Sequence, residues 1–326
     1  MSDQLNADRV LLVGAGGMAR EYARVLTALE RPMLVVGRGV GSAAAFEAAT
    51  GTTVGTGPLS TQLDALDSIP ETAIVAVNAM FLTDVAVELA EAGVRRLLLE
   101  KPGALDEDEL ERLVAAAERT GAEMRIGYNR RFMPSVRQAR RMVGEDGGVV
   151  SVKFDFSEPS RRIATLGKPE RELSTWFYGN SSHVVDLGLH FAGACDEVVG
   201  LVAGRVSWHP DAGVFVGSAR SATGALLSWH ANWVGPGRWG LEVMTAERRL
   251  IMQPLEQLRV QTHDSFDESP VDLGEPDGFK PGLLDQVRAF LDGVDADLLP
   301  TLAEHVTSFS TFEAIRTGRP PKERDR

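Results

Sequence analysis

The chain contains few of the residues that build disulfides, metal clusters or basic binding surfaces. Of its 326 residues only Cys195 is a cysteine, which excludes an internal disulfide and cannot by itself form a structural zinc site. Lys and Arg together number 34 against 46 Asp and Glu, giving a formal net charge of −12 with no basic block. Long-range attraction to nucleic acid or to an anionic membrane is therefore not expected.

Long apolar runs are also missing. Nowhere do roughly 18 apolar residues follow one another, as a transmembrane helix requires. The opening stretch MSDQLNADRV lacks the basic and apolar regions of a secretory signal. We therefore expect a cytoplasmic protein without a membrane partner. Hydrophobic residues make up 44% of the chain, a globular composition with room for two domains.

The first part of the chain alternates strand-like apolar runs with helical segments. LTDVAVELAEAG and LDEDELERLVAAAERTG have helical periodicity and end in the glycine expected just past a helix. This alternation predicts βαβ units and a doubly wound parallel sheet of the Rossmann type over residues 1–127. The expected strands are RVLLV (9–13), MLVVG (33–37), AIVAVN (73–78), RLLLE (96–100) and MRIGY (124–128).

After residue 127 the rhythm changes to strands with little helix between them. Residues 128–326 predict an α+β domain with a large, mainly antiparallel open sheet, which binds substrate and forms the oligomer. Its open face favours a homodimer or homotetramer. Helices are expected near 282–293 and 301–316, and the C-terminal helix is expected to pack back on the first domain. The expected strands are VVSVKFDF, EVVGLVAG, ALLSWHANW and GLEVMTA.

A glycine turn joins the first strand to the first helix in RVLLVGAGGMAREYARVL. It has the G-x-G-x-x-[G/A] form, in which the first glycine permits the turn, the second lets backbone approach a pyrophosphate, and the last small residue allows close packing of helix on strand. The turn predicts a dinucleotide site formed by Gly14, Gly16, Gly17, Met18 and Ala19.

The residue after the second strand bears on the choice of cofactor. An acidic residue there would bind the adenosine ribose and favour NAD, but MLVVG is followed by Arg38. A guanidinium binds phosphate in a bidentate manner and can stack on adenine. Arg38, supplemented by Ser42, therefore favours NADP(H), and NAD(H) is the alternative. If Arg38 does not bind the cofactor, it is an ordinary solvated residue of the loop.

The stretch LLLEKPGAL places charges at the end of an apolar strand. Pro102 stops the strand because it has no N–H to donate, so Lys101 lies at the edge of the sheet. Open α/β sheets bind their ligands beyond the carboxyl ends of the strands. Lys101 is therefore a candidate for the reacting end of a ligand, with Glu100 holding it.

The segment NSSHVVDLGLHFAGA places three polar residues on one helix face. His183, Asp186 and His190 are spaced i, i+3 and i+7. An Asp four residues before a His can stabilise its imidazolium, which favours His190 as the proton-transfer residue and Asp186 as its partner. A structural polar cluster is one alternative. A zinc site is another, although hydride transfer to nicotinamide needs no metal, and we expect none.

Together these motifs resemble the glucose-fructose oxidoreductase, inositol dehydrogenase and MocA family, written Gfo/Idh/MocA. The resemblance spans nearly the whole chain and rests on the glycine turn, the EKP triplet, the link GYNRRFMP and the D-x-x-x-H pair. Family members often carry Pro and then His after the third expected strand, where this chain has Ala79 and Thr83.

The resemblance implies hydride transfer between nicotinamide and a secondary alcohol or ketone of a sugar, cyclitol or nucleotide-sugar. It implies that Lys101, Asp186 and His190 handle the proton. Asn78 and Glu100 join the cofactor candidates. The substrate candidates, which offer hydrogen bonds and ring faces, are Tyr128, Asn129, Arg131, Trp176, Tyr178, Asn180 and His183.

Two other functions fit the same motifs. The site could reduce a C=N bond or use its cofactor in redox-neutral chemistry, and the sequence does not separate these from polyol oxidation. A dinucleotide-binding sensor without catalysis is the other alternative, although a sensor would not need Lys101, Asp186 and His190 together.

Overall fold

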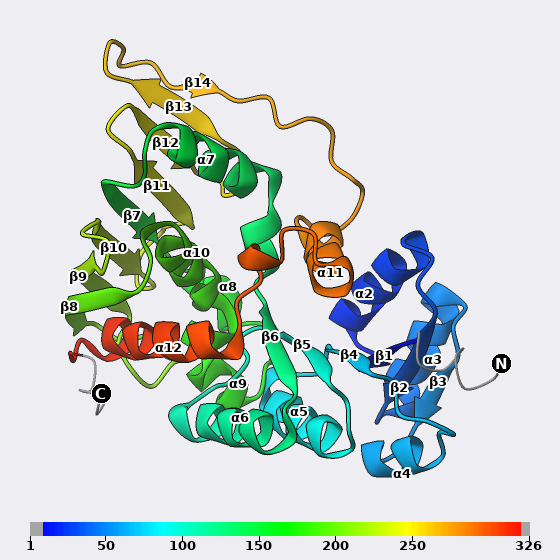
Figure 1. The fold of residues 1–326 in the computed structure, drawn as a ribbon. Coiled ribbons are helices and arrows are strands. Elements are labelled where there is room, and N and C mark those ends of the chain that lie inside the picture. The colour runs from blue at the N-terminus through cyan, green and yellow to red at the C-terminus, as the bar shows by residue number, and fades with distance from the viewer. Residues whose placement is uncertain (1–8, 321–326) are drawn as a thin grey trace. The chain divides into compact units, whose positions relative to one another are not determined.

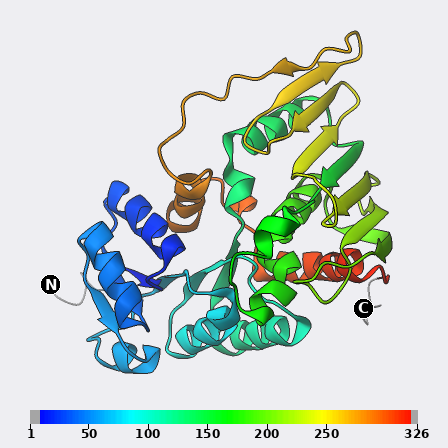
Figure 2. The ribbon, with the colours of Figure 1, turned by 180° about the vertical axis from the view of Figure 1, so that it is seen from behind.

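The computed structural model describes residues 9–320, which form two compact units (Figures 1 and 2). Unit 1 runs to Tyr128 and takes in Gly278–Leu302, whereas unit 2 comprises Asn129–Asp277 and the chain from Ala303 onward. The second domain predicted over 128–326 is therefore interrupted. The helix α11 (Leu283–Asp292), rather than the C-terminal helix α12 (Leu302–Thr317), lies within the segment that joins unit 1.

Unit 1 is built on the predicted parallel sheet. Its strands are ordered β3-β2-β1-β4-β5-β6, so the order reverses between β1 and β4, where such sheets bind ligands. The apolar runs become strands buried on both faces, as helices on either side of a parallel sheet require. The strands are β1 (Val10–Val13), β2 (Met33–Gly37), β3 (Val54–Thr56), β4 (Thr72–Val75), β5 (Arg96–Glu100) and β6 (Glu123–Gly127).

The helices of unit 1 follow the amphipathic segments of the sequence. Both segments with helical periodicity form helices, and the Asp106 carboxylate caps the second by accepting the backbone N–H of Glu109 at 2.8 Å. The helical elements are α2 (Gly17–Ala28), α3 (Val40–Thr50), α4 (Leu59–Asp64), η1 (Ala79–Phe81), α5 (Leu82–Glu91), α6 (Glu107–Thr120), α11 and η4 (Ala296–Leu298).

Unit 2 contains an eight-stranded sheet in the order β14-β13-β12-β11-β7-β10-β9-β8. The predicted antiparallel character is confirmed for every neighbouring pair except β7 and β10, which run parallel. The strands are β7 (Ser151–Asp155), β8 (Cys195–Ala203), β9 (Val214–Ser221), β10 (Leu226–Asn232), β11 (Gly240–Met244), β12 (Arg248–Met252), β13 (Arg259–Thr262) and β14 (Ser269–Pro270).

One face of this sheet is covered by helices. In Figures 1 and 2, α10 lies over the middle of the sheet, where it packs on β7 and β11. A Cβ on Gly188 of α10 would lie 2.8 Å from the Phe154 ring of β7, so only glycine allows this close approach. The helical elements of unit 2 are η2 (Asn129–Phe132), α7 (Pro134–Glu145), α8 (Ser160–Ile163), α9 (Glu170–Ser174), η3 (Phe177–Ser181), α10 (Ser182–Ala192) and α12.

No helix within residues 9–320 is long and apolar enough to cross a membrane.

Candidate active site

The glycine turn of unit 1 has the geometry that a dinucleotide needs. Gly14 follows β1 with φ +124°, and a Cβ there would meet the Ala76 carbonyl oxygen at 2.3 Å. Only glycine therefore fits this position. By contrast, a Cβ on Gly16 or Gly17 would meet no atom within 4 Å, so the start of α2 faces open space. The turn thus offers backbone N–H groups at a helix N-terminus to an anion.

A cavity of about 240 Å³ lies beside this turn within unit 1. It is lined by residues that follow the carboxyl ends of β1, β2 and β4, including Gly14, Arg38 and Val77. The Arg38 guanidinium lies 4.3 Å from the centre of the Phe81 ring, in a cation–π contact. Because no described residue forms a hydrogen bond or ion pair with Arg38, its N–H edge is available to a ligand. These residues fit a dinucleotide.

Three other cofactor candidates already have partners in unit 1. The Ser42 hydroxyl donates to the Gly39 carbonyl at 2.9 Å, and the Asn78 side chain accepts the Met80 N–H at 3.0 Å, which caps η1. The Met18 sulfur accepts from the Lys280 ammonium at 2.8 Å. Each therefore shapes the loop around the turn, and Ala19 is fully buried between helix and sheet.

Lys101 leaves β5 at the same edge of the sheet as the glycine turn, and it is half-buried. The preceding Glu100 is buried and accepts the Tyr22 hydroxyl at 2.7 Å, and Tyr22 in turn accepts the Gln286 side-chain amide at 2.8 Å. Burial raises the pKa of Glu100, although the charges of Lys101 and Lys280 and the hydrogen bond from Tyr22 oppose that effect. The network anchors the backbone that carries Lys101.

In unit 2 the structure gives Asp186 a different partner from the predicted one. The Asp186 carboxylate forms a bidentate pair with the Arg131 guanidinium of η2, with N–O distances of 2.6 and 2.8 Å. Both side chains are almost completely buried. The predicted Asp186–His190 pair is therefore wrong, because the planar guanidinium matches the carboxylate and occupies both of its oxygens. Arg131 itself, a predicted substrate residue, is thus the counter-ion of Asp186 on α10.

His190 faces a cation instead of a carboxylate. Its Nε2 atom lies 3.2 Å from the Arg140 guanidinium of α7. Burial, together with the positive charges of Arg131 and Arg140, holds the pKa of His190 well below its usual range. The ring is therefore neutral near pH 7, and the expectation of a stabilised imidazolium does not hold.

A buried carboxylate that sequence reasoning missed lies in the loop after β7. Glu158 is only 2% exposed and accepts hydrogen bonds from the Asn180 amide at 2.9 and 3.1 Å and from the Ser181 hydroxyl at 2.8 Å. Burial raises its pKa to about 6, although these two donors and the indoles of Trp176 and Trp239 lower it. Two predicted substrate residues, Trp176 and Asn180, thus meet around Glu158.

Glu158 and Trp239 left no signal in the sequence, because FSEPS and GPGRWG both have the composition of surface turns. Trp239 also lies near the predicted residue His183, with ring centres 6.2 Å apart, and its ring centre is 4.9 Å from the guanidinium of Arg130, which was not predicted. We define the Glu158 cluster as Glu158, Trp176, Asn180, Ser181 and Trp239.

The remaining substrate candidates lie in the interior. Tyr178 is 4% exposed and stacks on Phe309 of α12, with ring centres 4.9 Å apart, so its ring serves packing within unit 2. Tyr128 is fully buried at the end of unit 1, and Asn129 is buried at the start of unit 2.

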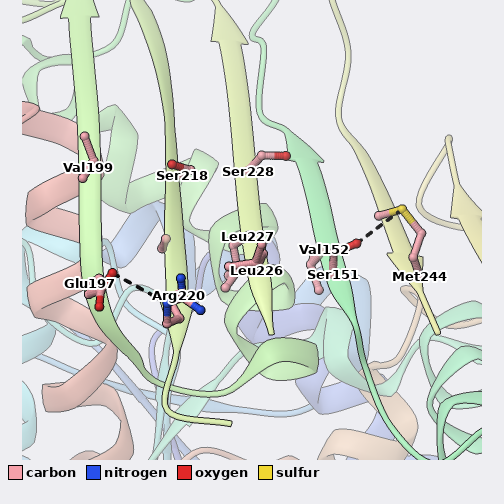
Figure 3. Close-up of a pocket in the computed structure, with 11 residues that line it drawn as sticks. Ser151, Val152, Glu197, Val199, Ser218, Arg220, Leu226, Leu227, Ser228 and Met244 are labelled. Atoms are coloured by element: carbon pink, nitrogen blue, oxygen red, sulfur yellow. Dashed lines mark hydrogen bonds and ion pairs between the residues drawn. The ribbon is translucent and has the colours of Figure 1, made fainter. Parts of the chain in front are cut away.

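The uncovered face of the unit 2 sheet carries a shallow groove (Figure 3). Figure 3 shows side chains of neighbouring strands along it, among them Val199 of β8, Arg220 of β9 and Leu226 of β10. Val199 is 68% exposed and Leu226 is 50% exposed, and Leu201 on the same strand as Val199 is 71% exposed. Such clustered apolar exposure is typical of an interaction surface.

Across residues 9–320, no three His, Cys, Asp or Glu side chains come close enough together to hold a metal ion.

Comparison with known proteins agrees with the geometry of unit 1. Residues 9–128 match the family model described as GFO_IDH_MocA, an oxidoreductase family with an NAD-binding Rossmann fold. Residues 9–128 therefore form the NAD-binding Rossmann domain of this oxidoreductase family. Comparison with curated protein sequences gives no match.

Solved structures of several oxidoreductases share the fold of nearly the whole chain. A levoglucosan dehydrogenase in complex with NADH is 18% identical, with a TM-score of 0.77, and the alignment covers 94% of this chain and 95% of that one. UDP-N-acetylglucosamine 3-dehydrogenase GnnA from Acidithiobacillus ferrooxidans is also 18% identical, with a TM-score of 0.73 and coverage of 94% and 96%.

A third structure, an oxidoreductase from Agrobacterium radiobacter in complex with NAD+, L-tartaric acid and magnesium, is 12% identical. Its TM-score is 0.76, with coverage of 94% of this chain and 95% of that one. The predicted fold, a Rossmann domain followed by a domain with a large, mainly antiparallel sheet, is confirmed by these likenesses.

Proposed function

We propose that this protein transfers hydride between a nicotinamide cofactor, preferably NADP(H), and a secondary alcohol or ketone of a neutral sugar or cyclitol. The observation that carries the proposal is the arrangement of unit 1, in which β5 delivers Lys101 to the same sheet edge as the open glycine turn. Structures with this fold include dehydrogenases of levoglucosan and of UDP-N-acetylglucosamine, which supports a sugar-type substrate.

Lys101 is the group that we assign to the reacting oxygen. The bound nicotinamide supplies or accepts the hydride. The Lys101 ammonium polarises a carbonyl during reduction and stabilises the alkoxide that develops during oxidation. The Tyr22–Glu100 hydrogen bond keeps the strand end that carries Lys101 in place.

His190 is assigned to the proton. Because the imidazole is neutral, a ring nitrogen of His190 can take the hydroxyl proton as the alcohol is oxidised, although its low pKa makes it a weak general base. Asp186 of α10 contributes by fixing the Arg131 guanidinium of η2, and not through direct contact with the imidazole.

Arg38 is the residue that favours NADP(H) over NAD(H). No acid follows β2, and the guanidinium on Phe81 leaves its N–H edge for a 2′-phosphate. NAD(H) is the alternative, and two of the three solved structures named above are complexes with NADH and with NAD+.

A substrate panel tests the proposed function. The chain would be assayed with NADP+ and NAD+ against levoglucosan, L-sorbose, myo-inositol, D-glucose, UDP-N-acetylglucosamine and L-tartrate, following the absorbance of the reduced nicotinamide. Turnover of a neutral member is expected. Tight cofactor binding without turnover of any member would contradict the proposal and favour a sensor, and turnover of an imine in a separate assay would favour C=N reduction.

The groove in Figure 3 supports a second proposal, that a second copy of the chain covers the open sheet face. Leu201 and Leu226 project from this face beside the exposed pair of Glu197 and Arg220, a mixture of apolar and complementary polar groups that suits an isologous contact. Light scattering should give a dimer or tetramer that Leu201→Asp dissociates. A monomeric wild-type protein with full activity would contradict this.

A further inference from the structure

We propose that Glu158 is a positioning residue of the substrate site, which fixes Asn180 as a hydrogen-bond acceptor for a hydroxyl group of a neutral polyol. The inference rests on the proposed function for the identity of the reaction. It goes further by naming the residue that selects the substrate and the chemical group that it recognises.

Glu158 fixes the orientation of the Asn180 amide. An ionised carboxylate only accepts hydrogen bonds, so Asn180 must turn its NH2 group toward Glu158, as the distances of 2.9 and 3.1 Å show. Its Oδ1 atom then points elsewhere, and no described residue donates a hydrogen bond to it. Because Asn180 is half-buried, this oxygen remains open to a ligand that carries a donor.

Glu158 also holds the backbone turn that contains Asn180. Asn180 and Ser181 lie in η3, which is a π-helical turn directly before α10. Such turns are frequent at functional sites. Glu158 holds η3 through two separate side chains, with the Ser181 hydroxyl donating at 2.8 Å. The carboxylate therefore positions the turn that enters the helix carrying His190.

Two tryptophan rings surround the Glu158 carboxylate. Trp176 and Trp239 are both half-buried, and their indoles lower the pKa of the Glu158 carboxyl group. Apolar ring surface therefore lies next to a few fixed polar groups. That combination is typical of a small-molecule site. A hydroxyl can donate to the Asn180 oxygen, whereas a carboxylate or phosphate has no proton to donate and is repelled by Glu158. The Glu158 cluster therefore favours a neutral polyol.

Two variants test the proposal, with the panel member of highest kcat/KM as substrate. Glu158→Gln and Asn180→Ala should each raise KM by about 10-fold, the loss of one good hydrogen bond, with kcat changed by less than about 2-fold. The double variant should match the single variants, because both changes remove the same contact. Glu247→Gln, an exposed position of unit 2, is the matched control.

The pH profile provides a readout that a purely structural role would not move. Glu158 faces Arg130 as its charged neighbour. Protonation gives Glu158 an O–H donor toward which Asn180 can turn its Oδ1 atom, so the orientation of the amide is no longer fixed. In the wild type kcat/KM should fall below a pH of about 6, and Glu158→Gln should lose this acidic limb. An unchanged limb in a folded Glu158→Gln variant would overturn the proposal.

Failure of the inference can be told apart from failure of the proposed function. If turnover is present but Glu158→Gln leaves KM unchanged, the inference alone is wrong. If no panel member turns over, binding of levoglucosan and L-sorbose is measured by quenching of tryptophan fluorescence, and loss of that binding in Asn180→Ala supports the inference without the activity. If Glu158→Gln does not fold, an unchanged KM or affinity in Asn180→Ala overturns it.

Discussion

Unit 1 presents its functional groups mainly through backbone at the ends of parallel strands, whereas unit 2 presents them through buried networks of side chains. In unit 1 the open Cβ positions of Gly16 and Gly17 and the strand-end position of Lys101 define the proposed site. In unit 2 the Arg131–Asp186 pair and the Glu158–Asn180 contact define it. A backbone site needs only a short motif, but a side-chain network needs partners from distant parts of the chain.

The two units should therefore respond differently to mutation. Changes in unit 1 should alter catalysis or cofactor binding and leave stability intact. Changes in unit 2 should affect stability and substrate binding together, because the same buried charges serve both.

The largest effect is expected for Lys101→Ala. Loss of the group that stabilises charge on the reacting oxygen should lower kcat by roughly 10²- to 10⁴-fold. Steady-state kinetics measures this, and fluorescence titration should show unchanged cofactor affinity. Arg119→Ala, which breaks an exposed ion pair with Glu91 and a long hydrogen bond to the Ala115 carbonyl, is the control within unit 1. A Lys101→Ala enzyme with wild-type kcat would remove Lys101 from the chemistry.

A large loss of stability is expected when the buried pair of unit 2 is broken. Asp186→Asn keeps the shape but leaves the Arg131 guanidinium buried without its counter-ion, which should cost about 3–5 kcal/mol of unfolding free energy. Denaturant titration measures it. The double variant Arg131→Met with Asp186→Leu should recover much of the loss. Equal stability of Asp186→Asn and wild type would show that the pair contributes nothing.

A smaller effect is expected on the binding free energy of the cofactor. Arg38→Ala should weaken NADPH binding by about 1.5–3 kcal/mol, the loss of a charge-assisted hydrogen bond, and change NADH binding little. Calorimetric titration of both cofactors decides the matter. Equal weakening of both would mean that Arg38 contacts the adenine or Phe81 alone and does not read a 2′-phosphate.

The smallest effect is the pH dependence of stability that Glu158 confers. Since its pKa is raised from 4.5 to about 6, the folded chain binds more protons there than the unfolded chain over this interval. The unfolding free energy should therefore fall by about 2 kcal/mol as the pH rises from below 4.5 to above 6. Glu158→Gln should lack this component, and identical pH curves would contradict the assignment.

The sequence predicted the fold of unit 1 well because its signals are local. Buried strands such as β5 are continuous apolar runs, and the glycine turn follows β1 directly. Strand β3 was not predicted, since it has only three residues with Gly55 in the middle. In unit 2, the short strands β12 and β13 carry charged residues among their apolar ones, so their apolar pattern is weak.

The side-chain partners of the site were much harder to predict. The spacing of Asp186 and His190 is compatible with a pair on one helix face, but the stronger bidentate contact with Arg131, 55 positions earlier in the chain, takes the carboxylate. Glu158 looks like a surface residue before a proline, and only the fold buries it beneath Asn180.

Transfer of deuterium tests the central assignment most directly. Panel members deuterated at their carbinol carbons would be incubated with the wild-type chain and NADP+, and the reduced cofactor would be analysed by mass spectrometry. Deuterium should appear in NADPH for a neutral polyol with wild type and nearly vanish with Lys101→Ala. Reduced cofactor without deuterium, or no reduced cofactor with any member despite tight binding of NADP+, would contradict hydride transfer from a secondary alcohol.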